Sequence, residues 1–71
     1  MDLTKAEEGK QYTIVGIDTE DEELDSFLFS LGCYSGEPIT VVSRRRLSCT
    51  IAVKDGRYSI DLSLAATIRI S

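Results

Sequence analysis

The chain has 71 residues, of which 42% are apolar and 28% charged, so we expect one small domain over residues 1–71. It contains no His or Trp and only two Cys, which excludes His-based triads, His-ligated metal centres and Cys-rich zinc or disulfide frameworks. Residues 1–37 carry two basic and ten acidic side chains, and residues 38–71 carry six basic and two acidic ones. The net charge of −4 argues against nucleic-acid binding, which depends on Lys and Arg.

The first half of the chain predicts one strand followed by one helix. β-branched and aromatic side chains over residues 12–17 predict the strand. The helix is expected to have Asp21, Glu22 and Glu23 at its start, where carboxylates suit a helix N-terminus, and to end at Gly32, which favours the left-handed conformation of a C-cap. Its apolar face has the spacing i, i+3, i+4 and i+7 and predicts core at Leu24, Phe27, Leu28 and Leu31.

Two features of this helix allow more than one interpretation. The acidic cluster over residues 18–25 fits helix capping and solubility, or else a surface for a divalent cation or a partner. It lacks the alternating acids and central Gly of a Ca²⁺ loop. Phe29 points away from the apolar face, so either a neighbouring strand buries it or it is an exposed contact residue.

The second half of the chain predicts four more short strands, over residues 39–42, 50–53, 58–63 and 67–70. Lys54-Asp55-Gly56-Arg57 contains the Asp-Gly pair typical of a tight hairpin, and residues 63–66 suit a single helical turn. Five strands with one α-helix inserted after the first predict a mainly β fold, a small β-barrel. Closure into a barrel would remove the edges that a short open sheet exposes.

The sequence predicts a cytoplasmic protein that does not insert directly into a membrane. No apolar stretch approaches the ~20 residues of a transmembrane helix, and the N-terminus lacks the basic-then-apolar run of a secretory signal. In that compartment Cys33 and Cys49 would be reduced, and we expect both to be buried as small apolar side chains.

No pattern in the chain resembles a catalytic site, so we expect no enzyme, no cofactor and no metal site. The two thiols supply at most half of a tetrahedral soft-metal site, and only a weak Fe²⁺ or Mn²⁺ site of surface carboxylates stays open. The run Arg44-Arg45-Arg46 predicts a solvated loop. The alternative is a small nucleic-acid-binding barrel that uses these arginines, with Tyr34 or Tyr58 for base stacking.

The order of these signals carries a family resemblance. The helix ends Leu28-Phe29-Ser30-Leu31-Gly32-Cys33, and it is followed by Gly36, the Val-rich segment 39–42 and the closing segment 66–70. This order resembles the FeoA family over essentially the whole chain. The family's signature is similar to Leu-Leu-x-Leu-Gly-(Leu/Met/Phe)-x-x-Gly, with Phe29 here at the second Leu position and Cys33 at the apolar position after the Gly.

The resemblance implies an SH3-like barrel and a role in bacterial ferrous iron uptake. It implies a non-enzymatic adaptor that binds the cytosolic, GTPase-bearing region of the membrane transporter FeoB and modulates its activity. We expect Phe29 and Tyr34, near the helix end, to contact this partner. The same resemblance leaves open a metal-sensing regulatory module like the C-terminal domain of iron-dependent repressors.

The chain departs from the family pattern in three places. Family helices often carry basic residues just before the Leu pair, whereas this chain has Glu22, Glu23 and Asp25, which argues against a positively charged docking surface. The loop that often reads Leu-Gly-Asp-Pro is here Leu47-Ser48-Cys49-Thr50, so a different turn is expected. Leu64 stands where an acidic residue is common.

Overall fold

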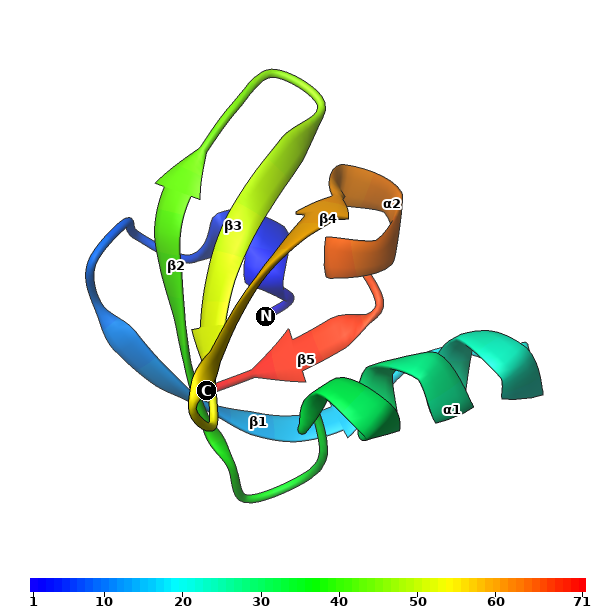
Figure 1. Cartoon of the computed structure of the whole chain (residues 1–71). Coiled ribbons are helices and arrows are strands. Elements are labelled where there is room, and N and C mark those ends of the chain that lie inside the picture. The colour runs from blue at the N-terminus through cyan, green and yellow to red at the C-terminus, as the bar shows by residue number, and fades with distance from the viewer.

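A five-stranded antiparallel sheet with one longer helix makes up the computed structural model, which describes residues 1–71 (Figure 1). The expected order is confirmed, with one α-helix inserted after the first strand. The elements in chain order are η1 (Leu3–Lys5, a 3-10 helix), β1 (Gln11–Ile17), α1 (Glu22–Leu31), β2 (Pro38–Arg44), β3 (Ser48–Val53), β4 (Gly56–Asp61), α2 (Leu62–Ala65) and β5 (Ile68–Ile70). None of these helices has the length and apolar composition needed to cross a membrane.

The strands lie in the order β4-β3-β2-β1-β5. β1 pairs with β2 through its first half and with β5 through its second half, and the register shifts at Val15. Such an irregularity bends a strand, which lets the sheet curl into a small barrel-like shape. The sheet does not close by hydrogen bonds, because β4 and β5 are its two ends and α2 connects them. The sheet is therefore barrel-like but not completely closed. The full closure that we expected, because it would remove exposed sheet edges, does not occur.

One apolar cluster fills the inside of the sheet. Alternate residues of the strands point into it, as Ile39 and Val41 do from β2 and Ile51 and Val53 from β3, and all four are at most 1% exposed. No polar or charged side chain is buried in it. Cys33 and Cys49 belong to the cluster as free thiols, so their expected burial is confirmed.

Helix α1 rests on this core along a narrow stripe. Leu28 is fully buried, and Leu24 and Leu31 are half-buried against the cluster. Phe27 is 50% exposed, so its prediction as a core residue is wrong. The ten-residue helix meets the sheet along one side only, and Phe27 lies on the flank of that stripe, where no strand covers it.

The turns that frame α1 and the β3–β4 hairpin follow local chemistry. The Asp21 side chain accepts hydrogen bonds from the N–H groups of Glu23 (3.0 Å) and Leu24 (3.2 Å), and Gly32 ends the helix with a φ of 101°. The expected hairpin forms, but Val53 pairs with Gly56, so its two central residues are Lys54 and Asp55 rather than the Asp-Gly pair. Lys54 takes the positive φ of 54°.

Candidate functional site

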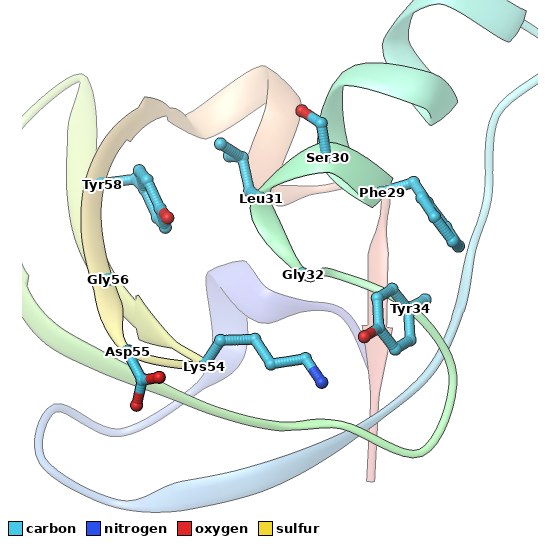
Figure 2. A pocket seen from close by; sticks show the side chains of 9 residues that line it. All are labelled: Phe29, Ser30, Leu31, Gly32, Tyr34, Lys54, Asp55, Gly56 and Tyr58. Carbon is cyan, nitrogen blue, oxygen red and sulfur yellow. The ribbon is translucent and has the colours of Figure 1, made fainter.

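The surface has one hollow, which lies where the C-terminal end of α1 faces the β3–β4 turn (Figure 2). It is open to solvent and measures about 600 Å³. Three segments that are distant in sequence contribute to it: the end of α1, the loop after it, and the hairpin. The lining residues are Phe29, Ser30, Leu31, Gly32, Tyr34, Lys54, Asp55, Gly56 and Tyr58.

Phe29 and Tyr34 form an aromatic pair on one side of this hollow. Their ring centroids are 4.8 Å apart and their planes are inclined by 35°. Phe29 is 63% exposed, which settles its two possible positions in favour of the surface. The structure thus brings together the two residues that were expected to contact a partner.

Lys54 joins the hairpin to the loop after α1. Its Nζ lies 2.7 Å from Oε1 of Glu37 and 4.9 Å from the centroid of the Tyr34 ring. The hydrogen bond to Glu37 raises the pKa of Lys54 above its ordinary value, and Tyr34 raises it further. The ammonium group therefore stays charged, and its contacts hold it beside the Tyr34 ring.

Gly32 allows this lysine to lie close to the helix end. A Cβ added at Gly32 would be 2.5 Å from Cγ of Lys54, so the aliphatic part of the lysine occupies the space that a larger residue would need. Gly is favoured here for two reasons: Lys54 fills the space that a side chain would need, and the φ of residue 32 is positive. The glycine of the signature thus shapes the hollow as well as ending the helix.

Sequence reasoning missed Lys54 as a member of the site. Its only local signal was its place in a hairpin turn, which says nothing about the helix end it packs against. Tyr58 was considered only as a stacking partner for the arginine run, and instead lines the hollow. None of Arg44, Arg45 and Arg46 lines it.

The arginine run itself divides into two parts. The guanidinium of Arg44 donates to the carbonyl oxygens of Leu3 (3.3 Å) and Ala6 (2.9 Å), so this residue holds η1 against the sheet. Arg45 and Arg46 are exposed, as the solvated-loop interpretation expects. Tyr34 and Tyr58, the tyrosines of the alternative nucleic-acid site, line the hollow, whereas the three arginines do not.

The helix beside the hollow is acidic on its exposed side. Its first turn contains Glu22, Glu23 and Asp25, and its last turn contains no basic residue. The ion pairs of the molecule join Glu7 to Lys10, Glu37 to Lys54 and Asp18 to Arg69, so none involves a carboxylate of α1. No group of three Cys, Asp or Glu side chains is placed to hold a metal ion. In chemical terms the site offers an aromatic pair beside the Lys54 ammonium, while the unpaired carboxylates lie at the other end of α1.

Comparison with solved structures shows the same fold in other proteins. An iron uptake regulatory protein, FeoA, superposes with a TM-score of 0.88 at 22% identity, covering 99% of this chain and 93% of that one. FeoA of Stenotrophomonas maltophilia in complex with zinc, described as a procaryotic SH3 domain protein, gives 0.89 at 16% identity, covering 100% and 89%. The TM-scores show that the fold is shared, which makes the sheet and helix SH3-like.

A third similar structure is a manganese-dependent transcriptional repressor. It gives a TM-score of 0.89 at 18% identity, covering 99% of this chain but only 40% of the repressor. No curated protein sequence matches the chain. The FeoA domain family, in contrast, matches it over residues 1–71, the full length described above. The chain is therefore a member of the FeoA domain family.

Proposed function

We propose that this chain is a non-enzymatic accessory protein of bacterial ferrous iron uptake. In this proposal it acts in the cytoplasm, binds the cytosolic, GTPase-bearing region of a FeoB-type transporter and modulates its activity. Family membership supports the iron-uptake role, as do two proteins of the same fold. One is named an iron uptake regulatory protein, and the other is described as a candidate activating factor of bacterial ferrous iron transport.

The observation that carries the proposal is the exposed aromatic pair at the end of α1. Phe29 leaves 63% of its surface in water although it lies on a short helix whose leucines are buried or half-buried. Aromatic side chains beside a hollow are frequent centres of protein–protein interfaces, because burying them removes much apolar surface from water. We assign Phe29 and Tyr34 to the interface with the transporter.

The surroundings of the pair support a preformed contact surface. Tyr34 packs against Phe29 on one side and Lys54 on the other, and Lys54 is held by Glu37. A side chain that is already held in one position loses less entropy when it binds. The partner would therefore meet a surface that needs little rearrangement.

The test is to replace Phe29 with Ser and measure binding to the purified cytosolic region of the transporter by calorimetry. We expect affinity to fall by about 30-fold, the effect of losing a central interface residue. Phe27→Ser is the matched control, because Phe27 is 50% exposed on the same helix but does not line the hollow. Its affinity should stay within about twofold of the wild type.

Circular dichroism would first establish that both variants fold. Undiminished binding by folded Phe29→Ser would remove Phe29 from the interface, and equal losses in both variants would remove the hollow as its centre. Absence of binding by the wild type would contradict the proposed function as a whole. Calorimetric titration with Fe²⁺ or Mn²⁺ distinguishes the metal-sensing alternative, since micromolar binding is not expected of a plain adaptor.

A further inference from the structure

The tip of the β2–β3 hairpin consists of Arg45, Arg46 and Leu47, and we call these three residues the basic tip. Leu47 is 74% exposed, more than any other large apolar side chain of the molecule. The backbone is held on both sides of the tip: the Arg45 N–H donates to the Ser48 carbonyl (2.8 Å), and the Leu62 N–H donates to the Leu47 carbonyl (3.2 Å). An apolar side chain is thus presented to solvent by a fixed loop between β2 and β3.

The positive charges of the basic tip are free. Neither Arg45 nor Arg46 takes part in an ion pair or a side-chain hydrogen bond. Two carboxylates lie at the base of the loop: Glu8 accepts a hydrogen bond from the backbone N–H of Arg44, and Asp61, opposite Ser48, accepts one from the backbone N–H of Leu64. Neither forms an ion pair with Arg45 or Arg46. Two unpaired cations therefore flank the most exposed apolar residue of the chain.

The basic tip and the acidic helix lie apart in the molecule. In Figure 1 the loop between β2 and β3 is at the top of the view, while α1 lies at the lower right. Although the net charge is −4, the side of the molecule that carries the tip can meet an anionic surface with α1 held away from it. The hollow at the end of α1 would stay accessible in that orientation.

We propose that the basic tip makes a peripheral contact with the surface of an anionic bilayer. Arg45 and Arg46 meet lipid phosphates, and Leu47 enters the layer between headgroups and acyl chains. Nucleic acid fits less well, because single strands are held by stacking on aromatic rings and the tip presents an aliphatic side chain instead. Two arginines and one leucine give weak, reversible binding, so the contact orients the chain at the membrane without anchoring it.

The experiment is co-sedimentation of the full chain with vesicles at low ionic strength. Vesicles of phosphatidylcholine mixed with phosphatidylglycerol are compared with vesicles of phosphatidylcholine alone. We expect binding to the anionic vesicles only. The double variant R45Q/R46Q should weaken it by about 25-fold, which corresponds to about fivefold for each arginine near an anionic leaflet. Leu47→Ser should weaken it by about fivefold or more through loss of apolar burial.

The matched control is R57Q/R69Q, which removes the same charge from two exposed arginines outside the tip and should change binding by less than about twofold. An equal loss in this control, or no preference for anionic vesicles, would overturn the proposal. A third result would also overturn it. In that result Leu47→Ser binds vesicles as tightly as the wild type does, and the wild type binds single-stranded DNA that R45Q/R46Q does not bind. That result would assign the arginines to nucleic acid. Because the arginine and leucine variants are judged separately, either one that folds decides the question.

None of these outcomes depends on the interface proposed at Phe29. The vesicle assay contains no transporter, and the calorimetric assay with the soluble cytosolic region contains no lipid. The two proposals can therefore fail independently.

Discussion

Among single residues, Cys33 shows how burial fixes a chemical property. It lies immediately after Gly32, is 1% exposed and belongs to the apolar core. Burial raises the pKa of the Cys33 thiol from 9.0 to about 11 by disfavouring the charged thiolate. Burial also raises the pKa of Cys49, where Arg44 opposes the shift. Both thiols are thus protonated at neutral pH and act as small apolar side chains.

The raised pKa of Cys33 predicts how stability depends on pH. In the unfolded chain the thiol ionises near its ordinary value of 9.0, whereas the folded protein retains the proton up to about pH 11. The contribution to the free energy of unfolding is therefore complete below pH 9 and is lost as pH rises through 11. Urea unfolding at a series of pH values should show a steeper decline between these values in the wild type than in Cys33→Ala. Parallel declines would contradict this account.

Residue positions were predictable from sequence where the signal was local. The helix end at Gly32 and the burial of both cysteines followed from residue type and neighbours, whereas Asp21 was expected only as one of three acidic residues at the helix start. The exposure of Phe27 did not, because the apolar spacing of a helix does not give the width of the surface it packs on.

At the scale of elements, α1 is held by a narrow line of contacts. Leu28 enters the core, while Leu24 and Leu31 cover its rim. The capped ends add local support. Since the rest of the helix surface is exposed, most of its stabilisation by packing comes from these leucines.

This arrangement predicts very different effects for two neighbouring substitutions. Leu28→Ala should lower the free energy of unfolding by about 2–5 kcal/mol, because it leaves a cavity in the core. Phe27→Ala should lower it by about 1 kcal/mol or less, because half of the side chain is already in water. Urea unfolding of both variants under identical conditions measures the difference. Similar losses would mean that Phe27 contributes to the core after all.

The hollow itself was beyond prediction from sequence. Strands and helix follow from periodicity and turn residues, but the contact between Gly32 and Lys54 depends on how the hairpin meets the helix end. Such long-range packing has no periodic signal in the chain. The family signature marked the helix end correctly and gave no information about the lysine that completes the site.

For the molecule as a whole, a single apolar cluster connects every helix and strand. Its members come from η1, all five strands and both helices, and no second cluster exists that could unfold separately. The fold class was predictable because each strand carries its own pattern. The lack of pairing between β4 and β5 was not predictable, since it depends on how α2 connects these two strands.

A single core predicts unfolding in one cooperative transition. Far-ultraviolet circular dichroism reports the sheet and helices, and tyrosine fluorescence reports Tyr12 in the core together with Tyr34 and Tyr58 at the hollow. In urea the two signals should give the same midpoint. An earlier fluorescence transition would show that the hollow loses its structure before the sheet does.

The two chain ends meet at β5. The N-terminal amine donates to the Ile70 carbonyl (3.3 Å), the Ile70 N–H donates to the Met1 carbonyl (2.8 Å), and Ser71 pairs with Thr13 on the adjacent strand. A polypeptide can therefore enter and leave this unit at nearly the same point. A host protein could carry the unit on a short tether or inside one of its surface loops with little distortion of either partner. The geometry also suits circular permutation, with a few residues joining the old ends and a new opening in an exposed turn.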